Sequence, residues 1–79
     1  MSSVRFERLK WKSRRGLLEL DLVLERFWKG EGQKMGEGEA NALERLLAMP
    51  DNDLLDLVMG RAETPDAHLR EMVEKLRAA

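Results

Sequence analysis

Apolar residues recur along this chain at spacings of three and four, the period of an amphipathic α-helix. The clearest run covers residues 17–29, where one arc of a helical wheel is apolar and the opposite arc is mainly charged. Leu18 and Leu22 break this division because they fall on the charged arc. We expect a second helix to cover them, or a partner to bind them. The apolar arc contains Leu17, Leu20, Val23, Leu24, Phe27 and Trp28.

A shorter helix is predicted before this run, over residues 4–13, with Phe6 and Leu9 on its apolar edge. Gly16 separates the two helices. Glycine costs about 1 kcal/mol inside a helix, so Gly16 indicates a corner or a close approach to another chain. After the second helix, four glycines fall within residues 30–38, which predicts a flexible loop.

A third helix is predicted over residues 39–49, ended by Pro50, because the residue before proline is pushed out of the helical region. Either Asp51 or Asn52 is a suitable N-cap for a short fourth helix. Gly60 is expected to stop that helix, as glycine commonly does just beyond a helix end.

The last helix has the clearest start, with Thr64 as N-cap, Pro65 at the first helical position and Asp66 near the positive helix end. The pattern therefore predicts an all-α fold, a small five-helix bundle that forms one domain over residues 1–79. The expected core contains Leu17, Leu20, Leu24, Phe27, Leu43, Leu47, Leu69, Met72 and Leu76.

Composition argues against catalysis and against a bound metal. The absence of cysteine excludes disulfides, thiolate zinc sites and thiol nucleophiles, and His68 is the only histidine. A single histidine without an orienting partner predicts a solvated surface imidazole. The glycine-rich segment lacks the Gly-Lys-Ser/Thr ending of a phosphate loop. Asp51, Asp53 and Asp56 lack the glycine and glutamate of a calcium loop.

The beginning of the chain has no apolar segment of the secretory type, and no apolar run approaches the roughly 20 residues that span a bilayer. We therefore expect a cytoplasmic location, or the matrix of an organelle if a leader was removed.

Charge is distributed unevenly along the chain. Residues 1–15 carry six basic side chains and one acid, a net +5, whereas the remaining residues carry −6. The basic segment could bind nucleic acid, with Trp11 stacking on a base. The acidic remainder would oppose a polyanion, and a plain basic face with Trp11 in the core is the simpler reading. A regulatory adaptor for an unrelated partner is a further alternative.

The corner between the first two helices allows two interpretations. In one, Arg15 and Glu19 form an ion pair four residues apart and Gly16 only makes the turn. In the other, Gly16 lets the backbone of a partner approach, while Arg15 and Glu19 supply opposite charges on either side. Exposed Leu18 and Leu22 would then add apolar area to an interaction surface.

Residues 9–21 resemble the signature of the small succinate dehydrogenase assembly factors of the SdhE type. The hallmark of that family is Arg-Gly-x-x-Glu, matched here by Arg15, Gly16 and Glu19. The resemblance extends along nearly all of the chain. Its other matching residues are Trp11, Arg14, Leu20, Asp21, Phe27, Leu46, Leu47, Asp53 and Leu54.

This resemblance implies a five-helix bundle with a non-catalytic role. Members of the family bind the flavoprotein subunit of succinate dehydrogenase, and in bacteria also that of fumarate reductase. They promote covalent attachment of FAD to a histidine of that subunit. FAD is then attached to the client protein, so we expect this chain to bind no cofactor stably. We also expect the free chain to be monomeric.

The resemblance carries the motif's partner-binding role to Arg15, Gly16 and Glu19. We add neighbouring side chains as further candidate contacts, namely Arg8, Trp11, Arg14, Leu18 and Asp21. The chain departs from the family pattern at residues 36–39, where relatives have Ser or Thr with acids and this chain has Gly-Glu-Gly-Glu. That difference weakens the N-cap, so the start of the third helix stays open.

Overall fold

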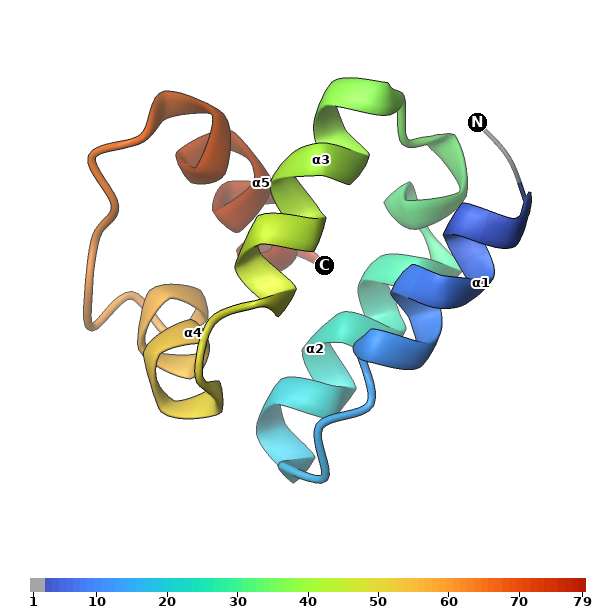
Figure 1. The fold of residues 1–79 in the computed structure, drawn as a ribbon. Coiled ribbons are helices and arrows are strands. Elements are labelled where there is room, and N and C mark those ends of the chain that lie inside the picture. Colours follow the sequence, from blue (N-terminus) through green and yellow to red (C-terminus); the bar gives the residue numbers. More distant parts are fainter. Residues whose placement is uncertain (1–2) are drawn as a thin grey trace.

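The computed structural model describes residues 3–79, and within that range it contains five α-helices and no β-strand. The all-α class and the five helices predicted from the sequence are therefore confirmed. Figure 1 shows α3 in the middle, with α1 and α2 on one side and α5 on the other. The elements are α1 (Ser3–Lys12), α2 (Leu18–Lys29), a 3₁₀ helix η1 (Glu31–Lys34), α3 (Glu37–Leu47), α4 (Asp51–Val58) and α5 (Ala67–Ala78).

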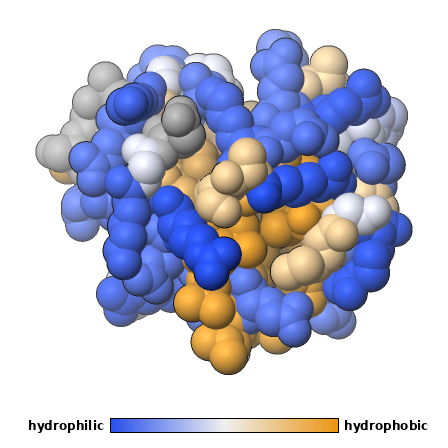
Figure 2. All heavy atoms as spheres, turned by 180° about the vertical axis from the view of Figure 1, so that it is seen from behind, coloured by the Kyte–Doolittle hydropathy of each residue, from blue (hydrophilic) through white to orange (hydrophobic). Residues whose placement is uncertain are grey.

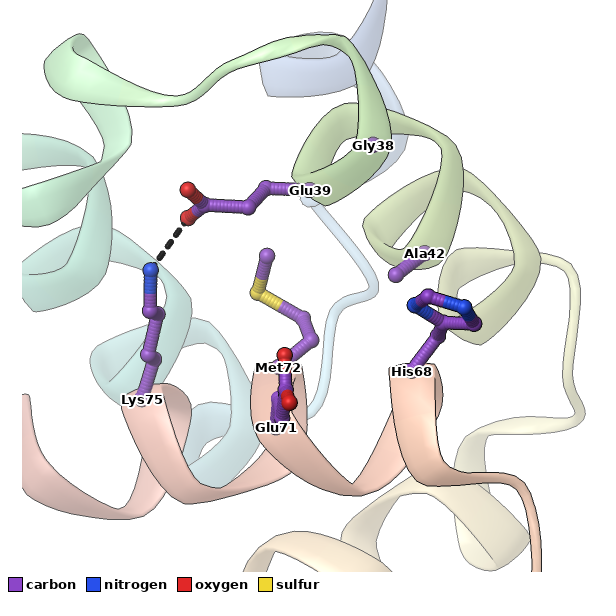
Figure 3. A pocket seen from close by; sticks show the side chains of 7 residues that line it. All are labelled: Gly38, Glu39, Ala42, His68, Glu71, Met72 and Lys75. Atoms are coloured by element: carbon purple, nitrogen blue, oxygen red, sulfur yellow. Dashed lines mark hydrogen bonds and ion pairs between the residues drawn. The ribbon is translucent and has the colours of Figure 1, made fainter.

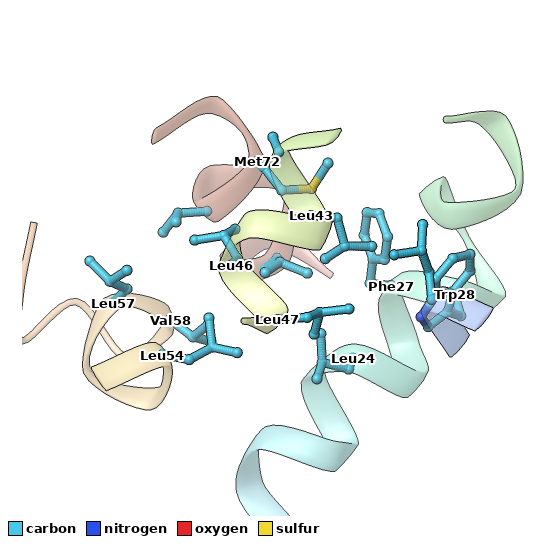
Figure 4. Close-up of a cluster of buried hydrophobic side chains, with 14 of the residues drawn as sticks. Leu24, Phe27, Trp28, Leu43, Leu46, Leu47, Leu54, Leu57, Val58 and Met72 are labelled. Carbon is cyan, nitrogen blue, oxygen red and sulfur yellow. The ribbon is translucent and has the colours of Figure 1, made fainter. Parts of the chain in front are cut away.

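One apolar core joins all of the helices, because each contributes the stripe that its sequence pattern predicts (Figure 4). Seven of the nine predicted core residues are buried. The other two, Leu17 and Leu69, pack against the core from its edge and are only partly buried. Leu17 precedes the first turn of α2, and Leu69 lies in the first turn of α5, so neither reaches the centre.

The glycine-rich segment after α2 is more ordered than predicted. It forms η1, and the side chain of Met35 is buried in the core. Gly32 packs directly on Trp28, since a Cβ added to Gly32 would lie 2.7 Å from Trp28 Cε3. At position 32 glycine is needed because the backbone passes too close to the indole ring of Trp28 to leave room for a side chain.

The start of α3 is two residues earlier than predicted. The helix begins at Glu37, after Gly36, which supplies no side-chain cap. It ends at Leu47 rather than at residue 49. Two acids in the first turn, Glu37 and Glu39, face the positive end of the helix dipole and compensate in part for the missing cap.

The predicted cap of α4 is wrong. Pro50 precedes the helix, and both Asp51 and Asn52 lie inside its first turn. The predicted stop is confirmed: Gly60 has φ +80°, and its N–H donates to Leu57 O at 3.2 Å. A left-handed residue just beyond the last turn closes the helix, and glycine adopts that conformation without strain.

The predicted cap of α5 is also wrong, because Asp66 and not Thr64 is the N-cap. Asp66 Oδ1 accepts hydrogen bonds from the N–H groups of His68 at 2.9 Å and Leu69 at 3.2 Å. The bond from Leu69, followed by that from Arg45, holds the pKa of Asp66 below its ordinary value. Thr64 has a smaller role, since its hydroxyl accepts from the N–H of Asp66 at 3.3 Å.

Candidate functional site

The corner between α1 and α2, residues 13–17, is braced by hydrogen bonds from other parts of the chain. Gly16 has φ +78°, in the left-handed region that glycine tolerates and other residues rarely adopt. The carboxylate of Asp21, in the first turn of α2, accepts from the N–H of Arg15 at 2.9 Å and from the N–H of Gly16 at 3.1 Å. Asp21, predicted as a partner contact, therefore has an internal structural role.

The side chain of Arg15 points into the molecule and is only 14% exposed. Its Nε donates to Asp51 Oδ1 at 2.7 Å. Its Nη1 donates to Leu47 O at 2.7 Å and its Nη2 to Met49 O at 2.8 Å, so the cation caps the C-terminal end of α3. A further bond from Nη1 reaches the carbonyl of Lys12 at 3.0 Å.

These contacts correct both sequence interpretations of Arg15. Its ion pair within the described residues is with Asp51, not with Glu19 four positions along. Arg15 also does not supply an exposed charge beside Gly16, because its guanidinium is engaged by α3 and α4. Glu19 is exposed in the first turn of α2, where the helix dipole favours an acid.

The side chains around the corner are exposed, and several are large and apolar. Trp11 is 72% exposed, Leu18 73% and Leu22 43%. Figure 2 shows apolar side chains at the surface at the lower end of the view, where Figure 1 places this corner. The guanidinium carbon of Arg14 lies 5.9 Å from the centroid of the Trp11 ring, a cation–π contact. Arg8 is also exposed.

The exposure of Trp11 rules out the alternative in which this side chain lies in the core. Trp28 is the buried tryptophan: its Nε1 donates to Ser13 Oγ at 2.9 Å, and that hydroxyl donates to Leu9 O at 2.9 Å. Ser13, missed from the sequence, thus ties the end of α1 to α2. For Leu18 and Leu22, the expectation of exposure is confirmed and the alternative of a covering helix is wrong.

An open groove of about 720 Å³ runs between α1 and α2 beside Gly16. Lys10 and Arg14 line it from α1 and the connection, and Asp21 and Glu25 from α2. Trp28 adds part of its indole, with Lys10 Nζ 5.6 Å from the ring centroid. The groove therefore presents charges of both signs over an apolar base, an arrangement suited to a polypeptide segment of mixed charge.

A second, smaller hollow of about 180 Å³ lies between α3 and α5 (Figure 3). His68 stands at its rim and is exposed, as predicted. Lys75 pairs with Glu39 across it, and Glu71 is the remaining acid. Among the residues that the structure describes, no cluster of three potential metal-ligating side chains is found, and no helix is long and apolar enough to cross a membrane.

Comparison with known proteins shows which family this chain is similar to. The family described as "Flavinator of succinate dehydrogenase" matches residues 7–79. Three relatives are each named "FAD assembly factor SdhE". That of Legionella pneumophila (strain Lens) is 43% identical over 89% of this chain and 87% of its own. That of Methylococcus capsulatus is 42% identical over 90% of this chain and 86% of its own. That of Ralstonia nicotianae is 40% identical over 90% of this chain and 79% of its own.

The match covers every helix from the middle of α1 onward, and it includes the corner with Arg15, Gly16 and Glu19. On these grounds, the chain belongs to the family of succinate dehydrogenase flavinators.

Proposed function

We propose that this chain binds the flavoprotein subunit of succinate dehydrogenase and promotes the covalent attachment of FAD to that subunit. The family match over residues 7–79 carries this proposal. The names of the relatives agree, since each is an FAD assembly factor. The chain acts as an assembly factor and not as an enzyme. The flavoprotein subunit of fumarate reductase is a second client, to which FAD is attached in the same way. The free protein is a monomer, and it acts in the cytoplasm.

The client contacts exposed residues in the corner and beside it: Trp11, Arg14, Leu18 and Glu19. Two apolar side chains flanked by a cation and an anion supply both buried area and charge complementarity. Gly16, which carries no side chain and meets no atom at its Cβ position, lets the client backbone come close.

The chemistry of attachment belongs to the client. A histidine nitrogen of the flavoprotein must be held at a methyl carbon of the flavin, while negative charge developing on the ring is stabilised. A small helical partner acts by ordering mobile parts of the client around the flavin, so that a rare reactive geometry becomes a populated one. An exposed apolar corner on a rigid bundle is suited to this task.

FAD is held by the client and not by this chain. The groove beside Gly16 supports this part of the proposal, because the carboxylates of Asp21 and Glu25 offset the cations of Lys10 and Arg14, so that the groove offers no net positive charge to the pyrophosphate of a dinucleotide. These lining residues do not fit a dinucleotide site. The sequence also lacks the glycine fingerprint of dinucleotide-binding folds.

Nucleic-acid binding is the competing function, and one observation favours it: Trp11 is exposed, and the guanidinium of Arg14 lies near its ring. Both functions are tested together by capture of partners on the tagged chain, read by mass spectrometry, and by retention on heparin. Nucleic-acid binding predicts steep salt dependence and an electrophoretic shift. Client binding predicts co-purification of a protein of flavoprotein-subunit size.

The decisive experiment reconstitutes attachment. The purified apo-flavoprotein subunit is incubated with FAD, with and without this chain, and covalent flavin is read by in-gel fluorescence. We expect the fluorescent band to appear faster and more completely with the chain. Equal flavinylation in both samples, together with no capture of the subunit, would contradict the proposal.

A further inference from the structure

We propose that Arg15 is a positioning residue that fixes the corner containing Gly16 and the adjoining start of α2 with Glu19, and that it makes no contact with the client itself. This inference rests on the proposed function. It departs from the simplest reading of the motif, in which Arg15 and Glu19 are paired recognition charges.

The guanidinium of Arg15 has little capacity left for a partner. An arginine side chain has five N–H donors. Four of those of Arg15 are used, by Asp51, Leu47, Met49 and Lys12. The side chain is 14% exposed. To contact a client, it would have to leave two carbonyls at the end of α3 without their donor and Asp51 without its cation.

The partners of Arg15 belong to three separate parts of the chain. Lys12 ends α1, Leu47 and Met49 lie at the end of α3, and Asp51 begins α4. The backbone N–H of Arg15 meanwhile binds Asp21 of α2. A single residue therefore joins the corner between α1 and α2 to the connection between α3 and α4.

We call these contacts of Arg15 the clamp. Loss of the clamp alters the corner in the free protein, and client binding weakens only as a consequence. Without the clamp, residues 13–17 sample more conformations, and only a fraction of the molecules present Glu19 and Leu18 correctly. The apparent dissociation constant rises in inverse proportion to that fraction. If about one molecule in ten retains the native corner, client binding weakens about tenfold.

The test uses Arg15→Ala, Asp51→Ala and the double variant, with Arg77→Ala as matched control. Arg77 makes an equivalent clamp elsewhere: its Nε and Nη2 donate to Leu57 O, at the end of α4, at 2.9 and 2.7 Å. Its carboxylate partners are Glu63 and Glu74, outside the corner. Arg77→Ala therefore lowers stability by loss of a half-buried arginine, without touching residues 13–17.

Affinity for the flavoprotein subunit is measured by biolayer interferometry, well below the lowest melting temperature of the set. We expect Arg15→Ala and Asp51→Ala each to raise Kd about tenfold, and the double variant no more than the stronger single one, because both break the same clamp. Arg77→Ala should melt earlier yet keep Kd within about twofold of wild type.

Three results would overturn the proposal. If Asp51→Ala binds normally while Arg15→Ala does not, Arg15 contacts the client. If the effects of Arg15→Ala and Asp51→Ala add, the two residues make separate contacts. If Arg77→Ala weakens binding as much, general instability explains the loss. Should Arg15→Ala fail to fold, Arg15→Lys replaces it: it keeps the charge but lacks the forked donors, so normal binding by Arg15→Lys would also contradict the proposal.

A second readout needs no client and separates this proposal from the proposed function. Amide hydrogen exchange at residues 13–17 should accelerate in Arg15→Ala and Asp51→Ala, and should stay at the wild-type rate in Arg77→Ala. Unchanged exchange in the first two variants would refute the clamp even if the wild-type chain promotes flavinylation. Faster exchange would support it even if the client proved to be another protein.

Discussion

Replacing Gly16 by arginine separates the folding role of this residue from its proposed role at the client surface. A Cβ at Gly16 would meet no atom within 4 Å, so the cost to stability is the backbone strain of φ +78°. That strain amounts to about 1–2 kcal/mol for a residue with a side chain. In a domain of this size, each kcal/mol lowers the melting temperature by about 4–8 °C.

Gly60 provides the matched control. Its φ is +80°, and its Cβ position is likewise open. Gly60→Arg therefore adds the same cation at the same backbone cost, but beyond α4 instead of beside Trp11 and Glu19. Both variants should remain folded and melt at similar, lowered temperatures.

Only Gly16→Arg should abolish client binding, because its side chain projects into the space that the client backbone is proposed to occupy. The assay is in-gel fluorescence of covalent flavin on the client, carried out below both melting temperatures. Full flavinylation with Gly16→Arg would refute the placement of Gly16 at the client surface. Equal loss with Gly60→Arg would show that instability, and not obstruction, is responsible.

Four further substitutions test other parts of the structure. Glu19→Ala should lower the melting temperature only slightly, since the side chain is exposed and loses only a weak interaction with the helix dipole. It should weaken client binding by about 2–5 kcal/mol if the charge is desolvated in the complex, as titration calorimetry would measure. Ser13→Ala should leave Trp28 Nε1 without its acceptor and cost about 1–3 kcal/mol in urea unfolding. Gly32→Ala should crowd the Trp28 ring and cost about 1–3 kcal/mol in the same assay. The pKa of Asp66 is lower in the folded state, so the ionised carboxylate stabilises the fold at pH values above its unfolded pKa. This stabilisation is lost as the pH falls through the folded-state pKa. Thermal melts should therefore show a smaller loss of stability in acid for Asp66→Asn than for wild type.

The helices were predictable because their apolar stripes are strong and local, but the caps were not. Thr64, Pro65 and Asp66 form a plausible start in which two residues are good N-caps. The choice between them depends on which carboxylate or hydroxyl reaches the free N–H groups. Asp66 reaches two of them and also meets Arg45, 21 residues earlier in the chain. Helical periodicity carries no information about that tertiary contact.

The candidate site shows the same division between local and distant information. The pattern located the corner, and it identified Leu18 and Leu22 as residues that the helix does not bury. It could not assign an inward direction to Arg15, because the acceptors lie 32–36 residues away. Nor could it place Trp11 outside the core, since an isolated aromatic residue near a helix end suits either environment.

The motif therefore combines three physical roles at one corner. Gly16 supplies a backbone conformation, Arg15 ties the corner to α3 and α4, and Glu19 extends into solvent from the first turn of α2. Loss of Arg15 and loss of Glu19 would both reduce flavinylation, yet only the first would alter the corner in the free protein. If fumarate reductase supplies a second client, as proposed, preference between the two flavoprotein subunits should respond to changes at Glu19, Trp11 and Leu18. It should not respond to changes at Arg15, because the contacts of Arg15 stay inside the bundle and touch neither subunit.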